Sequence, residues 1–122
     1  MSEVIRRGIT DVLAEVVETI KRGTKSVYVS FDNDSVDASH APGTTGPEPW
    51  GFTSREVVEM AITLGENGVG MLDIAELSPG YDPSGITARL DCYWVIYILS
   101  AYADALARGT AEPPVYAREG GQ

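Results

Sequence analysis

An acidic cluster directly follows a short apolar run in this chain. Residues 26–31 are rich in β-branched and aromatic side chains, which predicts a strand, and Asp32, Asp34 and Asp37 come next. Because side chains two apart in a strand point the same way, we expect Asp32 and Asp34 to present both carboxylates on one side. Carboxylates so close together repel each other unless a cation lies between them, and their hard oxygens suit Mg²⁺ or Mn²⁺. The spacing therefore makes a divalent-metal site one candidate function.

Other interpretations of the acidic cluster can be tested against its spelling. A solvated turn stays open, because Asp and Asn are common turn residues. The pattern of phosphatases with an aspartate nucleophile also stays open, with Asp32 as the nucleophile and Asp34 as the general acid. That chemistry leaves the following loop and Glu76 without a role. A calcium loop of the EF-hand type is excluded, because Val36 and Asp37 occupy its fifth and sixth places.

A long loop separates this cluster from the next regular element. Residues 38–52 contain three prolines and three glycines, which exclude a helix or a central strand there. A loop of this length inside a compact domain is more often functional than idle. Thr53 and Glu56 then have the spacing of a capping box, which predicts a helix from Thr53 to about Glu66.

The remaining elements have to position these residues. Apolar residues at spacings of three and four predict helices over residues 5–22 and 84–108. A second strand is expected over residues 69–77, with Asp73 and Glu76 toward its end. The alternation of helix and strand indicates an α/β fold in which helices cover both faces of a parallel sheet. Two strands are too few for a stable sheet, so we expect the sheet to continue in another chain or in further sequence.

The last predicted helix, residues 84–108, is apolar almost all round, so we expect it to be heavily buried or to lie at an interface. Cys92 on this helix is expected to fill a small space in the core. Arg89, Asp91 and Asp104 shorten its apolar run below the roughly 20 residues that cross a bilayer. We therefore predict no contact with a membrane.

Composition and charge limit the function classes. Nine Lys and Arg residues against eighteen Asp and Glu residues give a net charge of −9, which argues against a nucleic-acid binder. The single cysteine excludes an internal disulfide, and no stretch has the features of a secretion signal, so a cytoplasmic location is expected. His40 is the only histidine, so a site built from several imidazoles cannot be completed within these residues. His40 itself is expected to be a loop residue.

Two separated segments together resemble the arginase/agmatinase (ureohydrolase) family. The first contains Ser30-Phe31-Asp32-Asn33-Asp34-Ser35-Val36-Asp37 and then Ala41-Pro42-Gly43-Thr44-Thr45-Gly46-Pro47. It is similar to the family signature Ser-Phe-Asp-x-Asp-x-x-Asp-Pro followed by Ala-Pro-Gly-Thr-Gly-x-Pro. The second, Glu76-Leu77-Ser78-Pro79-Gly80-Tyr81-Asp82, is similar to the family segment Glu-Val-Asn/Ser-Pro-x-Tyr-Asp. Both occur in the right order with a helix between them, so the resemblance covers almost the whole chain.

The resemblance implies a three-layer α/β/α fold with a parallel sheet. Residues 1–109 would form the C-terminal part of a ureohydrolase domain, and residues 110–122 a loose tail. It also implies a binuclear Mn²⁺ centre, with Ni²⁺ as the alternative metal, because ligand type does not separate the two sharply. In this family a metal-bridging hydroxide attacks the guanidinium carbon of the substrate and urea is released.

Particular residues take roles from the resemblance by their position. Asp32 would bridge both metals, Asp34 would chelate one of them, and Glu76 would pair with the substrate guanidinium. Asp37 is expected to organise the loop rather than to bind metal. Asn33 departs from the family pattern, which has an aliphatic residue between the two ligands.

Further departures concern the loop and the rest of the ligand set. Ala38 stands where the family has proline, Thr45 interrupts the Gly-Thr-Gly segment, and Trp50 occupies a common glycine position. The remaining family ligands, a histidine and an Asp-Ala-His-x-Asp run, belong to an N-terminal half that these residues do not contain. We therefore expect this chain to supply half of the metal shell together with the guanidinium anchor.

The resulting prediction is an agmatinase-like hydrolase that converts a guanidino compound to an amine and urea. Arginine, guanidinobutyrate and guanidine stay open as substrates. The chain alone is expected to be inactive, and a second chain or a longer polypeptide would supply the missing half. The resemblance implies a trimer or a hexamer. The alternative prediction is an accessory or degenerate subunit that keeps the fold without catalysis.

Overall fold

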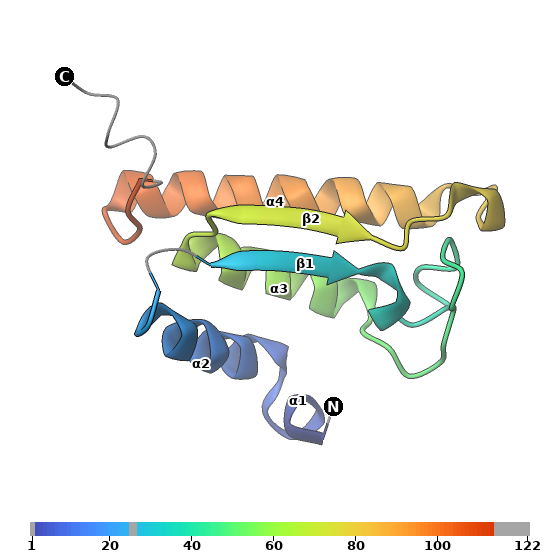
Figure 1. Ribbon diagram of the computed structural model, residues 1–122, viewed down its shortest axis with the longest axis horizontal. Coiled ribbons are helices and arrows are strands. Elements are labelled where there is room, and N and C mark those ends of the chain that lie inside the picture. The colour runs from blue at the N-terminus through green and yellow to red at the C-terminus, as the bar shows by residue number, and fades with distance from the viewer. Residues whose placement is uncertain (1, 25–26, 114–122) are drawn as a thin grey trace.

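The computed structural model describes residues 2–24 and 27–113 of the chain. Two strands alternate with helices along the sequence (Figure 1). The elements are α1 (Ser2–Arg7), α2 (Ile9–Lys21), β1 (Tyr28–Asp32), α3 (Ser54–Asn67), β2 (Met71–Ala75) and α4 (Ile86–Arg108), with 3₁₀ turns at Asn33–Ser35 and Pro79–Tyr81. Apart from the first helix, the order and type of the elements are those that the sequence predicts.

The two strands lie side by side and run parallel, which confirms the predicted α/β arrangement. Tyr28 pairs with Met71 at one end of the ladder, and Asp32 pairs with Ala75 at the other. Both carboxyl ends therefore meet at one edge of the sheet. Open α/β sheets bind their ligands at this edge.

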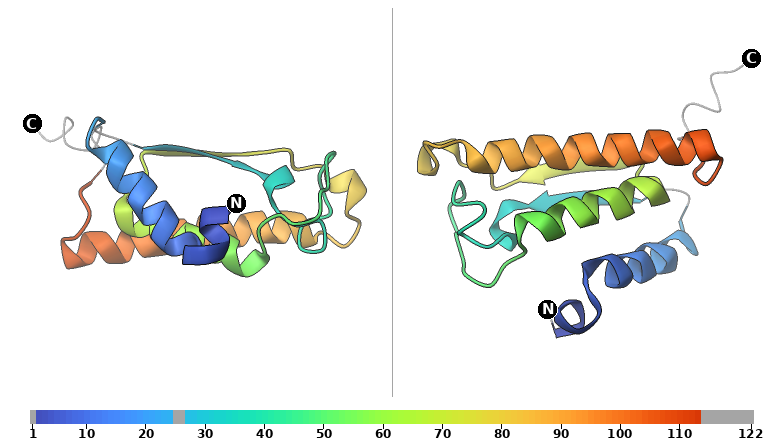
Figure 2. Two further views of the ribbon diagram at one scale, coloured as in Figure 1. Left: turned by 90° about the horizontal axis from the view of Figure 1, so that it is seen from below. Right: turned by 180° about the vertical axis from the view of Figure 1, so that it is seen from behind.

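Alternate side chains of the strands point to opposite faces of the sheet. The inward side chains are Val29, Phe31, Leu72 and Ile74, which all belong to the core or pack against it. The outward side chains Tyr28, Ser30, Met71 and Asp73 are exposed. Figure 2 shows that α2, α3 and α4 all lie on the inward side of the strands. Within the described residues, helices cover only one face of the sheet.

The core lies between the strands and the layer of α3 and α4. Phe31 of β1 stacks on Trp94 of α4, with ring centroids 4.7 Å apart. Val57 of α3 and Val36, just beyond the 3₁₀ turn, are completely buried in the same cluster. The apolar core therefore extends directly beneath the acidic cluster and supports it.

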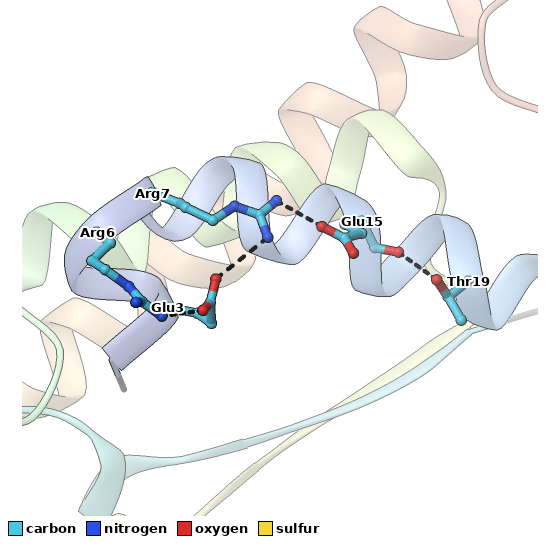
Figure 3. A network of polar contacts seen from close by, with 5 residues as sticks. All are labelled: Glu3, Arg6, Arg7, Glu15 and Thr19. Carbon is cyan, nitrogen blue, oxygen red and sulfur yellow. Dashed lines mark hydrogen bonds and ion pairs between the residues drawn. The ribbon is translucent and has the colours of Figure 1, made fainter.

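The single helix predicted over residues 5–22 is two helices in the structure. Gly8 has a φ of 83°, a left-handed conformation that cannot continue a right-handed helix. The apolar spacing did not reveal this break, because it persists on both sides of it. Arg7 forms ion pairs with Glu3 and, at 2.6 Å, with Glu15 across the break (Figure 3). These side chains are exposed, so the pairs contribute little to stability.

A capping box fixes the start of α3, as the sequence predicts. The Thr53 hydroxyl accepts the Glu56 N–H at 3.2 Å, and the Glu56 carboxylate accepts the Thr53 N–H at 2.8 Å. We expect Thr53→Ala to lower the free energy of unfolding by about 1 kcal/mol, because it leaves a helix-terminal N–H without its partner. Urea denaturation measures this loss. Thr19→Ala, at an exposed position of α2, is the control, and equal losses in both variants would contradict the assignment.

The helices α3 and α4 approach each other closely at Gly65. A Cβ atom there would lie 2.4 Å from the Ile98 carbonyl oxygen and 2.8 Å from the Ala101 Cβ. We expect Gly65→Ala to lower the free energy of unfolding by about 1–3 kcal/mol, because the two helices would have to move apart. Gly80→Ala is the matched control, since a Cβ at Gly80 meets nothing within 4 Å. Equal stability of the two variants in calorimetry would argue against close packing at Gly65.

The helix α4 is buried on one side only. Leu90, Trp94 and Ile98 face the core, whereas Cys92 is exposed, so the prediction that Cys92 fills a core space is wrong. The large apolar residues exposed on this helix are Ile86, Tyr93, Ile96, Tyr97 and Leu99. They were expected to be buried or to lie at an interface.

By length and composition alone, α4 is apolar enough to cross a membrane. Its charged residues therefore do not exclude a span by themselves, contrary to the prediction. A core helix of a soluble protein passes the same test. The inward side of α4 packs on α3 and, through Trp94, on the strand residue Phe31. Only 28% of the most apolar stretch of α4 is buried, however, so a large part of its apolar surface stays exposed.

The segment after α4 starts at Gly109, whose φ of 71° ends the helix as predicted. The Tyr102 hydroxyl donates to the Glu112 carbonyl oxygen at 2.8 Å, so the first residues of this segment contact the helix. Residues 114–122 of the predicted loose tail lie outside the described residues. The predicted boundary of the domain at residue 109 stays a prediction.

Candidate active site

Asp32 and Asp34 lie where β1 ends. Asp32 is the last residue of the strand, and its carboxylate accepts the Asp34 N–H at 2.9 Å. The Ser35 hydroxyl donates to the Asp32 carbonyl oxygen at 2.6 Å. Asp34 thus lies in the 3₁₀ turn and not in the strand, so the predicted strand geometry of the pair is wrong. The turn, capped by the Asp32 side chain, links the two aspartates instead.

The loop over residues 38–52 closes around Asp34. Thr44 is only 1% exposed, and its hydroxyl donates to Oδ1 of Asp34. A Cβ atom at Gly46 would lie 2.8 Å from Oδ2 of the same carboxylate. Only glycine allows the backbone to come so close without a shift. The loop therefore orients the Asp34 carboxylate through the Thr44 hydroxyl and through the close backbone of Gly46.

Glu76 directly follows β2 at the same edge of the sheet. Its φ of 59° is a left-handed conformation that residues other than glycine rarely adopt. Such strain is concentrated at functional sites. The Thr45 hydroxyl donates to Oε2 of Glu76 at 3.1 Å. Because Thr44 bonds Asp34 and Thr45 bonds Glu76, two adjacent loop residues connect the carboxylates that follow the two strands.

The Asp37 carboxylate is directed at the loop. Its Oδ1 accepts the backbone N–H and the hydroxyl of Ser39 at 2.9 and 2.5 Å, and its Oδ2 accepts the Trp50 N–H at 2.8 Å. These bonds, above all the one from the Ser39 hydroxyl, lower the pKa of the Asp37 carboxyl. Trp50 itself is 82% exposed. This arrangement suits the organisation of the loop that the sequence suggested for Asp37.

Asp82 anchors the loop to the start of α4, a role that the sequence analysis missed. The buried Asp82 carboxylate accepts the N–H groups of Ser84 and Thr87 and also both of their hydroxyls. The Thr87 hydroxyl in turn accepts the Gly43 N–H at 2.8 Å. Asp82 belongs to a recognised motif, which is a signal for it, but no sequence signal marks Thr87.

The hydrogen bonds to the Asp82 carboxylate make the free energy of unfolding depend on pH. They lower the pKa of Asp82 to about 2, with the Ser84 hydroxyl as the largest cause. The folded-state pKa lies below the unfolded one, so the stabilisation is present above about pH 4 and is lost as the pH falls toward 2. We expect Asp82→Asn to be less stable at neutral pH and to lose less stability between about pH 4 and 2. Urea titrations at several pH values test this, and identical pH slopes in both proteins would contradict it.

A buried polar pair lies beneath the acidic cluster and was also missed. Asn33 is 0% exposed and Asp91 of α4 is 4% exposed. The Asn33 Nδ2 donates to Oδ2 of Asp91 and to the Ala75 carbonyl oxygen, both at 3.2 Å. Burial raises the pKa of the Asp91 carboxyl. From the sequence, Asn33 has the character of a turn residue and Asp91 that of a charge on a helix surface.

The described residues fit part of a divalent-metal site. Asp32 and Asp34 provide carboxylate oxygens, which Mn²⁺ accepts. Between residues 2 and 113, leaving out residues 25 and 26, no group of three or more His, Cys, Asp and Glu side chains is placed to hold a metal ion. His40 lies in the loop, as predicted, and its Nδ1 is 3.2 Å from the Ser54 hydroxyl. A complete binuclear shell needs further donors.

Comparison with known proteins gives a consistent result at the level of sequence. A model of the arginase family matches residues 1–100. Agmatinase of Chromobacterium violaceum is 41% identical over 81 residues, which are 66% of this chain and 24% of that protein. Agmatinase of Edwardsiella ictaluri is 39% identical over 87 residues, which are 71% of this chain and 28% of that protein. The chain thus spans about a quarter of the length of these curated relatives.

Solved structures give the same result for the fold. Arginase of Bacillus caldovelox has a TM-score of 0.76 at 31% identity, over 80% of this chain and 33% of that one. Proclavaminate amidino hydrolase of Streptomyces clavuligerus has a TM-score of 0.74 at 36% identity, over 85% of this chain and 35% of that one. Formiminoglutamase of Trypanosoma cruzi, solved with Mn²⁺, has a TM-score of 0.71 at 27% identity, over 84% and 34%. These likenesses confirm the predicted α/β fold, with helices flanking a parallel sheet.

Proposed function

Because this chain belongs to the arginase family, we propose that it forms part of a binuclear-metal amidinohydrolase. The reaction would convert a guanidino compound to an amine and urea. One observation carries this proposal: the adjacent Thr44 and Thr45 bond Asp34 and Glu76, respectively. These two bonds connect the proposed metal-binding carboxylate and the proposed guanidinium-binding carboxylate through adjacent loop residues.

The two aspartates would hold the metal ions, with Asp32 bridging both and Asp34 chelating one. Mn²⁺ is the preferred metal, supported by the Trypanosoma cruzi structure, and Ni²⁺ is the alternative. When bound, such a pair of ions would lower the pKa of a shared water and stabilise negative charge on its oxygen. The contribution of this chain is orientation, since Thr44 and the Asp34 N–H fix the two carboxylates before any ion arrives.

Glu76 would bind the guanidinium group of the substrate. A carboxylate can accept two parallel N–H bonds from a planar guanidinium, which fixes its plane and position. Holding a resonance-stabilised cation in one orientation lowers the entropic part of the barrier. Thr45 restrains the Glu76 side chain by its bond to Oε2. Glu76 is therefore proposed as the residue that presents the guanidinium carbon to the nucleophile.

An agmatine-like substrate is favoured by the two agmatinases, which are 41% and 39% identical to the aligned parts of this chain. A solved relative that is 36% identical is named a proclavaminate amidino hydrolase, so guanidino compounds other than agmatine are also tested. Arginine and guanidinobutyrate are the most useful comparisons, because they differ from agmatine in the charge at the far end of the molecule. The same carboxylate anchor suits all three.

We infer that the described residues do not complete the site. The ligand set contains two carboxylates and no neighbouring imidazole, and the sheet face with Tyr28 and Met71 is not covered by described residues. Further strands and ligands would come from another segment or another chain, in a cytoplasmic trimer or hexamer. The second candidate, an accessory subunit without catalysis, is favoured by the same small ligand set.

Urea release tests the proposal directly. The purified chain and its native assembly are incubated with Mn²⁺ and agmatine, arginine or guanidinobutyrate, and metal content is measured on the same samples. We expect turnover and about two metal ions per site in the assembly, and no turnover by the chain alone. Rapid turnover by the chain alone would overturn the claim of incompleteness. An assembly without metal and without urea release would favour the accessory subunit.

A further inference from the structure

Asn33 stands between the two proposed metal ligands, and its side chain points into the protein. It is completely buried, whereas Asp32 is exposed and Asp34 is half-buried. The turn therefore directs the middle side chain toward the core and leaves the two aspartates at the surface. Contacts that fix the buried Asn33 side chain therefore also fix the 3₁₀ turn between Asp32 and Val36.

The Asn33 amide group connects three parts of the fold. Its Nδ2 donates to the Ala75 carbonyl oxygen at the end of β2 and to the Asp91 carboxylate on α4, each at 3.2 Å. Its backbone carbonyl oxygen accepts the Val36 N–H at 3.1 Å and closes the 3₁₀ turn. Ala75 directly precedes Glu76. One side chain thus joins the turn of the aspartates, the strand end before the guanidinium anchor, and a helix that provides no proposed ligand.

Burying Asn33 and Asp91 in the core is energetically unfavourable compared with burying apolar side chains. Burying an amide and a carboxyl requires hydrogen bonds for all of their polar atoms, and an apolar pair of similar volume needs none. Oδ1 of Asn33, Oδ1 of Asp91 and Nε1 of Trp94 are buried without a hydrogen-bond partner among the described residues. Packing alone would favour aliphatic side chains at residues 33 and 91. Packing alone therefore does not explain why a hydrogen-bonded polar pair occupies these two positions.

We propose that Asn33 and Asp91 form a buried polar clamp that positions Asp32 and Asp34, so that α4 sets the metal affinity of the turn without contributing a ligand. The clamp rests on the proposed metal-binding role of the two aspartates. A hydrogen bond fixes direction as well as distance, which an aliphatic contact does not. Partners that orient metal ligands from behind typically change metal affinity about 10–100-fold when they are replaced.

Two variants of Asp91 separate positioning from packing. Asp91→Asn keeps an oxygen that accepts the Asn33 amide, whereas Asp91→Leu keeps the branched shape in a larger side chain and removes the acceptor. Asp104→Leu is the control, because Asp104 is an exposed carboxylate on the same helix. Mn²⁺ binding by the native assembly is measured by titration, and exchange of the Asp34 N–H in the full chain without metal is measured by NMR. The Asp34 N–H reports on the turn because it is bonded to the Asp32 carboxylate.

We expect Asp91→Leu to weaken Mn²⁺ binding about ten-fold and to speed exchange of the Asp34 N–H by a similar factor. Asp91→Asn and Asp104→Leu should remain within about two-fold of the wild type. Asn33→Leu should behave like Asp91→Leu, and the double variant should lose no more than either single variant, because both remove the same bond.

A lower melting temperature in Asp91→Leu with unchanged Mn²⁺ binding and unchanged Asp34 exchange would overturn the clamp, because the pair would then serve packing alone. A wild-type assembly that binds no Mn²⁺ would instead count against the proposed function. In that case, faster Asp34 exchange in Asp91→Leu, but not in Asp91→Asn, would still support the clamp, and unchanged exchange would overturn it. The two failures are therefore distinguishable.

Discussion

Replacing Asp32 and Asp34 together by Asn is expected to abolish Mn²⁺ binding and to reduce urea release by the assembled enzyme at least about 1,000-fold. A metal pair supplies several kcal/mol of transition-state stabilisation, and each 1.36 kcal/mol corresponds to a factor of ten in rate. Asn has nearly the volume of Asp and keeps one oxygen that can accept the bonds from Thr44 and from the Asp34 N–H. The loss should therefore arise from charge and ligation rather than from misfolding.

Metal analysis and urea assays on the same preparation measure this effect. Asp11→Asn, an exposed position on α2, is the matched control for loss of a surface carboxylate and should leave both quantities unchanged. Circular dichroism should show the same helix content in all variants. If the double variant kept its metal content and its activity, the aspartates would not be ligands, and the assignment of this edge of the sheet as the active site would fall.

The sequence predicts those features of the site that short, continuous segments encode. A strand followed by Asp32 and Asp34, a loop rich in proline and glycine, and a capping box at Thr53 all follow from short segments. The parallel pairing then places Glu76 at the same edge as Asp32, because parallel strands have their carboxyl ends together. The order of helices and strands alone therefore predicts that Glu76 and Asp32 lie at the carboxyl edge of the sheet.

The exact geometry depends on contacts between distant segments, and there the sequence interpretation was incomplete or wrong. Asp34 leaves the strand because Ser35 and the Asp32 carboxylate close a 3₁₀ turn. The bond between Asn33 and Asp91 joins residues that are 58 positions apart, and no local pattern encodes it. The helix break at Gly8 was not predicted for a local reason. A single φ angle interrupts the helix there, while the apolar pattern continues through it.

Replacing Glu76 by Gln is expected to reduce kcat/KM for a guanidino substrate about 30–5,000-fold while leaving Mn²⁺ binding unchanged. Removing one partner of a close charge pair costs about 2–5 kcal/mol, which corresponds to this range of rates. The amide keeps the size of the side chain but loses the charge and one of the two acceptor positions that a guanidinium needs. Thr45→Val removes only the hydroxyl bond to Glu76, so we expect a loss of about ten-fold or less.

The backbone of Glu76 supplies a second and independent variant. Its φ of 59° is strained for glutamate and free of strain for glycine, so Glu76→Gly should fold with a stability within about 1 kcal/mol of the wild type. The same variant lacks the carboxylate and should lose activity at least as severely as Glu76→Gln. Such a split between stability and activity is expected of a strained residue that serves binding. If both variants kept kcat/KM within a few-fold of the wild type, another group would have to bind the guanidinium, and Glu76 would be only a strained turn residue.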